Sequence, residues 1–510
     1  MRKEGYLERC SLAQAGIRAE GVRQFLDEVE KAGYHLHSFM ITRHGKVAYE
    51  CSWAPYRLDE EHLMHSFTKG LVATAIGILE GEGRLALDDK VVSYYPEYDL
   101  KDREGRLGNM TLRHLLTMTG GHGDVPDRHG CDDEIFTFLN HPMKYEPGTH
   151  FMYDSLGTHM LASIVKRVTG CNLFQFLQLR LFDPMGIQGV YCDSCASGKD
   201  QGGGGSRMKT EDMAKITVLF LNGGMWEGQQ LVPKDWIDQM TAVRFEESID
   251  ASNPDWEDWR CGYGFQVWMC QIPHTFRFDG MYGQFGVVLK DYDASIVTTC
   301  GENYTQAVLR LMWQYLIPAM EEGTAKEDQS GVEAELEELK KRLYIHWPLD
   351  DEAGPENAEK LWKKLDGKEL VFPKNRESML PSGRVDNCFT SSWTEKNRTG
   401  IARITLSLTD EGCELEYEDN KNHGVLPVGI KGEPRRGLLK SLWGDYKVWT
   451  GARWNAQGEL EVQIRMVNGE YYQVFTLTPQ EDTVAVNIYG GPWDRRKGKP
   501  EGNTWLCRKK

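Results

Sequence analysis

Ser66-Phe67-Thr68-Lys69 is the stretch on which the interpretation of the fold depends, together with the apolar run that follows it, Leu71-Val72-Ala73-Thr74-Ala75-Ile76-Gly77-Ile78-Leu79. If the apolar run is a helix, Ser66 and Lys69 share one face near its N-terminus, because residues i and i+3 are neighbours on a helix. A serine hydroxyl needs a base within hydrogen-bond reach to act as a nucleophile. A desolvated lysine whose pKa has fallen can be that base. The stretch is therefore a candidate acylation site without a histidine.

The S-x-x-K pattern alone is weak evidence, because it occurs three times in this sequence. The other two pairs are Ser163/Lys166 and Ser206/Lys209. Ser163 lies inside a periodic apolar segment and begins no helix. Ser206 follows four glycines, Gly202 to Gly205, which we expect to form a flexible loop. Only Ser66 has the expected position at a helix start.

The composition limits the classes of function. The chain has 510 residues, of which 40% are hydrophobic, so it can form two or three domains with at least one large core. Its formal net charge of −16 argues against nucleic acid and anionic membrane surfaces as partners. The first ten residues contain no apolar signal region, and no stretch of eighteen apolar residues occurs. We expect a cytoplasmic protein whose twelve cysteines are reduced thiols.

Two short clusters contain metal-ligating residue types. Cys192 and Cys195 form a single C-x-x-C without a second pair at zinc-finger spacing. His129, Cys131 and Asp132 also lie close together in sequence. Both clusters are more typical of polar loops than of metal sites, so we predict no metal and no cofactor.

The hydrophobic pattern of residues 1–325 predicts one α+β domain. Helices are expected over residues 8–34, from Ser66 to about residue 81, and over residues 111–116, 155–169, 209–221 and 307–320. Strands are expected as a hairpin over residues 37–50 and later over residues 265–270, 275–278, 285–289 and 295–299. Because strands occur at both ends of this segment, we expect an antiparallel sheet that joins the two ends and is flanked by helices.

The remaining sequence differs in character. Residues 326–372 are highly charged and predict a helical linker. Residues 373–510 contain short alternating strands, for example Leu460, Val462 and Ile464, and the turn pair Asn468-Gly469. They predict a small all-β barrel or sandwich domain with a structural, lid or oligomerisation role. The chain therefore allows a homo-oligomer.

Two features downstream of Ser66 strengthen the hypothesis of an acylation site. Tyr153 precedes an amphipathic helix, and a phenol placed between a lysine and a serine could take the serine proton and return it to a leaving group. The segment Phe278-Asp279-Gly280-Met281 contains a glycine that lets a substrate approach a strand closely. A backbone amide there, together with the Ser66 N–H, could form an oxyanion hole.

The S-x-x-K motif at Ser66, then Tyr153, then the segment that contains Gly280 follow one another along the chain. In this order, these three features resemble those of the serine β-lactamase and penicillin-binding protein superfamily. They are most similar to its class C β-lactamase-like esterases and amidohydrolases, whose pattern is S-x-x-K, then Y-x-N, then a K-T-G or H-x-G strand. The surrounding segments Leu112-Arg-His-Leu-Leu-Thr-Met-Thr-Gly-Gly and Glu146-Pro-Gly are also similar to the family. The resemblance covers residues 20–320.

The resemblance implies a role for each matching residue. Ser66 would be the acylated nucleophile, Lys69 its activating amine and Tyr153 the general base and acid. Gly280 would end the third motif, Met281 would supply the second oxyanion amide, and Ser155 and Asp279 would contribute to substrate binding.

Two positions depart from the family pattern. Ser155 stands where the second motif usually has asparagine, and Phe278 stands where the third motif has a lysine or histidine. Penicillin-like substrates therefore lose the cation that meets their carboxylate. Strand alternation would point the neighbouring Arg277 to the other face. Because the cation of the third motif is missing, we expect Lys69 to carry more of the work of lowering the pKa of Tyr153.

The sequence thus predicts a serine hydrolase that forms an acyl-enzyme on Ser66 and cleaves a small ester or amide. β-Lactamase or D-amino-acid peptidase activity is one alternative. A non-catalytic binding or assembly module on the same fold is another. Aromatic residues between 256 and 282, among them Trp259, Tyr263 and Trp268, indicate either an apolar substrate pocket or ordinary core packing.

Overall fold

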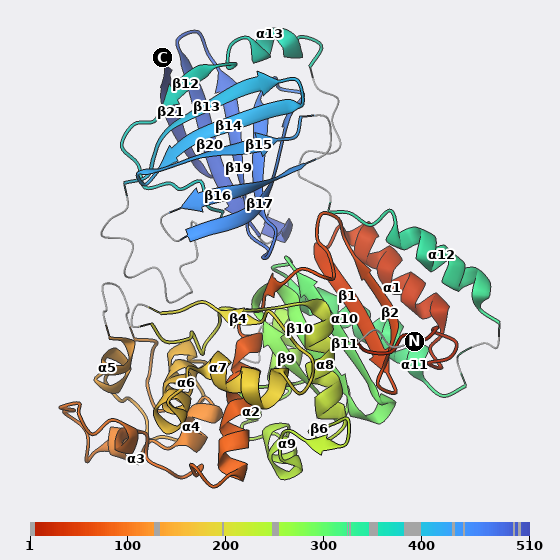
Figure 1. Cartoon of the computed structure of the whole chain (residues 1–510), viewed down its shortest axis with the longest axis vertical. Coiled ribbons are helices and arrows are strands. Elements are labelled where there is room, and N and C mark those ends of the chain that lie inside the picture. Colours follow the sequence, from red (N-terminus) through yellow and green to blue (C-terminus); the bar gives the residue numbers. More distant parts are fainter. Residues whose placement is uncertain are drawn as a thin grey trace. The chain divides into compact units, whose positions relative to one another are not determined.

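The structure is a computed structural model of the chain (Figure 1). It describes residues 6–126, 133–195, 198–246, 254–323, 325, 328–345, 355–381, 399–430, 434–441, 444–492, 495–497 and 501–510. The chain divides into two compact units. Unit 1 contains Met1–Cys300 and Tyr304–Leu343, and unit 2 contains Gly301–Asn303 and Tyr344–Lys510.

The centre of unit 1 is a six-stranded antiparallel sheet in the order β2-β1-β11-β10-β9-β8. Its strands come from both ends of the unit, because β1 near the N-terminus pairs with β11 near residue 300. This confirms the predicted α+β class. The strands are β1 (Leu36–Arg43), β2 (Lys46–Ser52), β8 (Trp268–Met269), β9 (Thr275–Gly280), β10 (Gln284–Leu289) and β11 (Ala294–Cys300).

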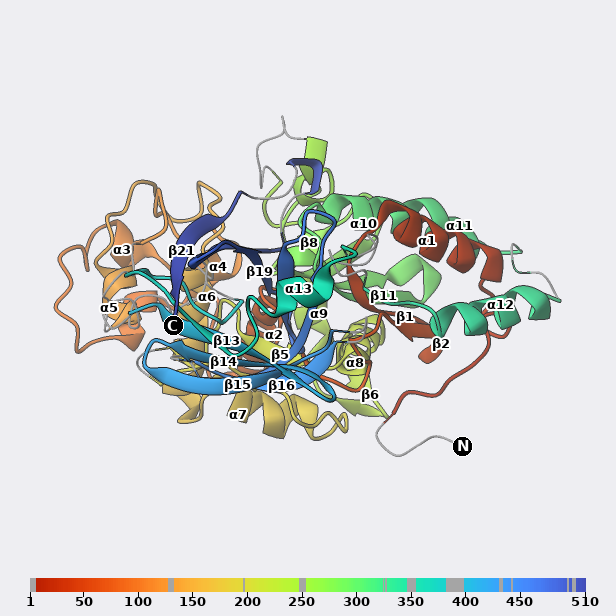
Figure 2. The ribbon, with the colours of Figure 1, turned by 90° about the horizontal axis from the view of Figure 1, so that it is seen from above.

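Helices cover both faces of this sheet. Phe25 of α1 packs on Phe39 of β1, with ring centroids 4.8 Å apart. The neighbouring Ser38 points to the other face, where its Oγ lies 2.7 Å from Thr210 Oγ1 of α8. Figure 2 shows β1 and β11 between α1, α10 and α11 on one side and α8 on the other. The helices are α1 (Ala19–Ala32), α2 (Phe67–Gly81), α3 (Arg106–Asn109), α4 (Leu112–Leu116), α5 (Glu134–Leu139), α6 (Ser155–Thr169), α7 (Leu173–Leu177), α8 (Thr210–Leu221), α9 (Lys234–Met240), α10 (Thr305–Leu311), α11 (Ile317–Met320) and α12 (Ser330–Lys340).

Short strands complete unit 1. A three-stranded sheet has the order β3-β5-β4, and its strand β3 comes just before α2 in the sequence; β6 pairs with β7. Their bounds are β3 (His62–Leu63), β4 (Tyr191–Cys192), β5 (Ser206–Met208), β6 (Met225–Trp226) and β7 (Gln229–Gln230). None of the helices in the described residues is long and apolar enough to span a membrane.

Three elements differ from the sequence predictions. The predicted helix over residues 8–34 is helical only from Ala19, and Arg9 instead bridges to Val47. The predicted strand over residues 265–270 shrinks to β8, because Gln266 has a φ of 63° and its amide donates to the carbonyls of Leu115 and Leu116. The helix over residues 307–320 contains a π-helical turn, Met312–Leu316, between α10 and α11.

Helix α12 lies in the segment for which a linker was predicted, but it belongs to unit 1. Leu336 is buried, and Tyr49 of β2 donates a hydrogen bond to its carbonyl. The Lys340 ammonium also lies 4.3 Å from the centroid of the Tyr49 ring. The apolar side of this charged helix therefore covers part of unit 1.

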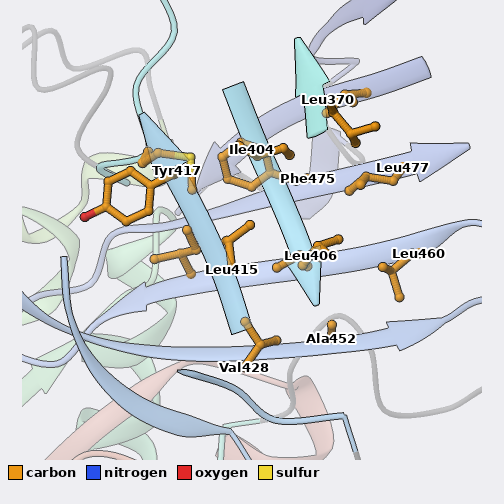
Figure 3. Packing of buried hydrophobic residues seen from close by; sticks show 14 of the residues in the cluster. Leu370, Ile404, Leu406, Leu415, Tyr417, Val428, Ala452, Leu460, Phe475 and Leu477 are labelled. Atoms are coloured by element: carbon orange, nitrogen blue, oxygen red, sulfur yellow. The ribbon is translucent and has the colours of Figure 1, made fainter. Parts of the chain in front are cut away.

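Unit 2 is a ten-stranded antiparallel sheet that curls into a nearly closed barrel, in the order β15-β14-β13-β12-β21-β20-β19-β18-β17-β16. Alternate residues point inward to form one apolar core, as Ile404, Leu415, Leu460 and Phe475 do in Figure 3. This confirms the predicted all-β domain in its barrel form. The elements are α13 (Ala358–Trp362), β12 (Lys368–Val371), β13 (Ile401–Thr409), β14 (Gly412–Asp419), β15 (Asn422–Val428), β16 (Arg435–Ser441), β17 (Gly444–Trp454), β18 (Leu460–Met466), β19 (Tyr472–Pro479), β20 (Thr483–Gly491) and β21 (Asn503–Lys509).

Candidate active site

Ser66 stands at the start of α2, one residue before its first helical position. The preceding His65 has a φ of 48°, a left-handed conformation that is uncommon for a residue other than glycine. It turns the chain sharply between β3 and the helix. Backbone strain of this kind occurs often at active sites.

The Lys69 ammonium lies directly against the Ser66 hydroxyl. Nζ is 3.0 Å from Ser66 Oγ and 2.9 Å from Ser155 Oγ at the start of α6, and it donates to the carbonyl of Gly203. Only 1% of Lys69 is exposed. The helix start, α6 and the glycine loop thus position one buried amine at the candidate nucleophile.

The other two S-x-x-K pairs have different surroundings. Ser163 is buried in the middle of α6. Ser206 is buried in β5, where its Oγ lies 2.7 Å from Thr68 Oγ1. The four preceding glycines are buried rather than a flexible loop, because Gly202 packs so closely on α6 that an added Cβ would lie 2.6 Å from the Ala162 Cβ. The sequence did not predict the contact between Lys69 and the Gly203 carbonyl. The glycine run was the available signal, because residues without a Cβ let this segment pack closely on α6.

Tyr153 joins the group from the segment that precedes α6. Its ring centroid is 5.0 Å from Lys69 Nζ, and it stacks on Trp268 of β8 at 5.7 Å. Burial raises the pKa of Tyr153, and a hydrogen bond with Ser66 lowers it. The charge of Asp279 raises this pKa further, whereas that of Arg277 lowers it. Arg277 is thus a cation whose effect on Tyr153 the sequence reasoning, which assigned this task to Lys69, did not foresee.

The third motif brings β9 next to the start of α2. A Cβ added to Gly280 would lie 2.2 Å from the carbonyl oxygen of Met64, so only glycine fits where the strand meets the backbone just before Ser66. Met281 follows at the end of the strand and is partly exposed. The structure thus brings the candidate oxyanion segment close to the candidate nucleophile.

The two faces of β9 carry different side chains. Phe278 is buried beneath α2 and stacks on Phe67, with ring centroids 5.0 Å apart. On the other face, the Arg277 Nε donates to Asp279 Oδ2 at 2.7 Å. Phe278 thus takes the sequence position of the family's cation but is packed in the core, and the ion pair lies on the opposite face of the strand.

An aromatic cluster surrounds Tyr153. Tyr263 and Trp268 form its buried part with Met118, and Phe151, Tyr153 and Trp259 pack against them. Two other aromatic residues of the same sequence region pack elsewhere, Phe265 on Trp236 and Tyr282 on His65. The aromatic region of the sequence thus serves both the candidate site and the core.

One group of side chains in unit 1 has metal-ligating types. Glu134, His159 and Cys195 are buried, and one potential ligand atom of each lies within 4.8 Å of the others. The Gly202 N–H donates to His159 Nδ1 at 3.4 Å, which places the proton of a neutral ring on Nε2. In that tautomer Nε2 offers no lone pair to a metal ion. The earlier candidates His129, Cys131 and Asp132 lie outside the described residues.

The two residues of the C-x-x-C cluster, Cys192 and Cys195, form no disulfide with each other. Cys192 Sγ lies 3.5 Å from the carbonyl oxygen of Gln201 and 3.6 Å from that of Gly204. The ten cysteines within the described residues form no disulfide with one another.

A family model described as Beta-lactamase matches residues 23–319, which is more than half of the chain. The chain belongs to the Beta-lactamase family. This family assignment agrees with the six-stranded sheet and its flanking helices.

The curated proteins to which the chain is similar include an esterase and a hydrolase of the 6-aminohexanoate dimer. The chain is 28% identical over 176 residues to esterase EstB of Burkholderia gladioli, which covers 29% of this chain and 45% of the esterase. It is 25% identical over 230 residues to the 6-aminohexanoate-dimer hydrolase of Paenarthrobacter ureafaciens, which covers 42% of this chain and 58% of that enzyme. The matches therefore span about half the length of these relatives.

Among solved structures, a protein of Bacteroides dorei provisionally called a beta-lactamase has a similar fold. The TM-score is 0.50 at 15% identity, and the match covers 59% of this chain and 99% of that protein. At this identity the likeness concerns the fold alone.

Proposed function

We propose that this member of the family is a serine hydrolase that forms an acyl-enzyme on Ser66 and cleaves a small ester or amide. The observation that carries the proposal is the 3.0 Å contact between Lys69 Nζ and Ser66 Oγ in a buried site. An amine at this distance can accept the serine proton once it is neutral. The similarity to an esterase and to a 6-aminohexanoate-dimer hydrolase supports the same class of reaction.

Tyr153 would complete the proton transfer. Because burial raises the pKa of Tyr153, the phenol is protonated at neutral pH. Lys69 and Tyr153 must therefore lose one proton between them before they can accept the proton of Ser66. After acylation, the same two groups can return a proton to the leaving alcohol or amine.

The developing oxyanion would be stabilised by backbone amides. The Ser66 N–H lies at the start of α2, where the helix dipole favours negative charge. The Met281 N–H would be its partner, since Gly280 brings that end of β9 against the backbone that precedes Ser66. Two such donors are the usual arrangement for acyl transfer.

β-Lactamase or peptidase chemistry is less well supported by the site. Phe278 is packed under α2 and offers no charge to a substrate carboxylate. A location in the cytoplasm, a homo-oligomeric state and the absence of nucleic acid or membrane partners stay predictions of the sequence.

Hydrolysis of p-nitrophenyl butyrate tests the proposal. The wild type should release p-nitrophenol faster than the Ser66→Ala variant, which should show only the background rate. Ser163→Ala is the matched control, because it removes a serine from another S-x-x-K pair and should keep the wild-type rate. Equal rates for wild type and Ser66→Ala would exclude Ser66 as the nucleophile.

A further inference from the structure

Asp279 presents a carboxylate at the end of β9, one residue before Gly280. Its side chain lies on the opposite face of the strand from Phe278, because side chains alternate along a strand. Oδ2 accepts a hydrogen bond from Arg277 Nε at 2.7 Å. Oδ1 accepts none from the residues that the structure describes, and 10% of the side chain is exposed. This oxygen is therefore able to accept a donor from outside the protein.

The cation of this ion pair is not accessible. Arg277 is fully buried. Its Nη1 donates to the carbonyls of Met269 at 2.9 Å and Asp258 at 3.2 Å, and its guanidinium lies 4.5 Å from the centroid of the Trp259 ring. In this ion pair the carboxylate of Asp279 is therefore partly exposed, whereas the guanidinium of Arg277 is buried.

Asp279 lies within the electrostatic range of the candidate catalytic groups. Its charge raises the pKa of Tyr153 and contributes to the raised pKa of Tyr263. Burial raises the pKa of Asp279 itself, while Arg277 and, to a smaller extent, Lys69 oppose this rise. Arg277 therefore helps to keep Asp279 ionised next to the site.

The other charged groups here do not attract an anionic substrate. The Lys69 ammonium donates to Ser66, Ser155 and Gly203, and only 1% of the residue is exposed. Phe278 replaces the cation that the third motif of the family would supply. Around Ser66, the described part of β9 thus offers a partly exposed carboxylate and no exposed cation.

We propose that Asp279 is a specificity-determining residue that receives an ammonium group of the substrate. This inference rests on the proposed Ser66 hydrolase and narrows its substrate class to esters or amides that carry a positive charge close to the scissile bond. An ammonium donates hydrogen bonds and has the opposite charge to Asp279. It therefore forms a stronger hydrogen bond with this carboxylate than a neutral group does. A substrate carboxylate at the same place would be repelled by Asp279.

Matched p-nitrophenyl esters test this proposal. One pair consists of the acetate and the glycinate, and a second of the hexanoate and the 6-aminohexanoate, so that each pair differs only by a terminal ammonium. The mono-p-nitrophenyl ester of adipate provides the anionic comparison. The wild type should have the higher kcat/KM for the ammonium ester of at least one pair and the lowest for the adipate ester.

The Asp279→Asn variant should reduce the ratio of kcat/KM between ammonium and neutral ester by about tenfold or more, the scale of one charged hydrogen bond. Asp279→Glu keeps the charge and should retain part of the preference. The control is Asp291→Asn, which removes an exposed carboxylate paired with His274 beyond the other end of the β9–β10 hairpin. It should leave the ratio unchanged.

A second measurement needs no variant. Hexylammonium should inhibit wild-type hydrolysis of p-nitrophenyl butyrate at lower concentration than hexanoate does, and equal inhibition would overturn the proposal. An unchanged ratio in a folded Asp279→Asn protein that still hydrolyses the neutral esters would also overturn it, while the hydrolase itself would stand. Absence of turnover with every ester would instead refute the proposed function.

Discussion

The two sheets of this protein are both antiparallel, yet they use their residues differently. In the barrel of unit 2, alternate side chains such as Leu415, Leu460 and Phe475 fill one apolar core. In unit 1, β8 pairs with β9 at Phe276 and Arg277, and within the described residues this pairing does not reach Asp279 and Gly280. The candidate reactive groups gather at this incompletely paired end. Within the described residues, the candidate reactive groups thus lie where the sheet of unit 1 is open beside a helix start, whereas the nearly closed sheet of unit 2 encloses an apolar core.

The largest effect is expected at Lys69. Lys69→Gln removes the amine that contacts Ser66 Oγ, so kcat for p-nitrophenyl butyrate should fall by about a hundredfold to ten-thousandfold, the usual contribution of a general base. Lys166→Gln is the matched control from another S-x-x-K pair and should keep the wild-type kcat. A Lys69→Gln variant with wild-type kcat would show that the buried amine only supports the structure.

The next effect compares a buried ion pair of unit 1 with an exposed one of unit 2. Arg277→Met removes the buried partner of Asp279, whose side chain is only 10% exposed, so the free energy of unfolding should fall by about 3–5 kcal/mol. Arg403 pairs with Glu369 and Glu418 near the barrel surface, and Arg403→Met should lower the free energy of unfolding far less, because solvent screens an exposed ion pair. Urea unfolding measures both, and equal losses would contradict the contrast between the two regions.

Two glycines offer a third comparison, because each faces an aromatic side chain. An added Cβ would lie 2.1 Å from the Phe278 ring at Gly70 in α2, and 2.2 Å from the Tyr417 hydroxyl at Gly424 in β15. Each change to alanine should lower the free energy of unfolding by about 1–3 kcal/mol through overpacking. Only Gly70→Ala, next to Lys69, should also slow p-nitrophenyl butyrate hydrolysis by the folded protein. Equal slowing of hydrolysis by both variants would contradict the predicted difference between the two glycines.

The smallest predicted effect is a shift in pH dependence. Burial raises the pKa of Tyr153. The titratable and charged groups that surround this phenol are Ser66, Lys69, Tyr263, Arg277 and Asp279. The rate should therefore increase as the pH rises, because the base form is needed. Asp279→Asn removes a negative charge that raises this pKa, so the rising limb of the kcat profile for a neutral ester should move to lower pH by about one unit. A shift to higher pH would contradict this electrostatic account.

The sequence predicted much of this architecture because it depends on local patterns. The hairpin around His44, α2, α6 with its Gly170 end and α8 all follow from hydrophobic periodicity and capping residues. The three motifs also indicated Ser66, Lys69 and Tyr153, which the structure brings together.

What the sequence did not predict depends on contacts between distant segments. The carbonyl of Gly203 meets Lys69 only because the glycine run packs on α6. Strand alternation assigns Arg277 to the face opposite Phe278, so the sequence did not predict its ion pair with Asp279. Charge acts through space, however, so a side chain on the far face of a strand still changes the pKa of Tyr153.

The central claim is that Ser66 is an activated nucleophile, and labelling with a fluorophosphonate probe tests it most directly. Intact-mass measurement followed by peptide mapping should find a single adduct, located on Ser66. The adduct should be absent from Ser66→Ala and present in Ser163→Ala. A wild-type protein that gains no adduct, or an adduct that persists in Ser66→Ala, would contradict the claim.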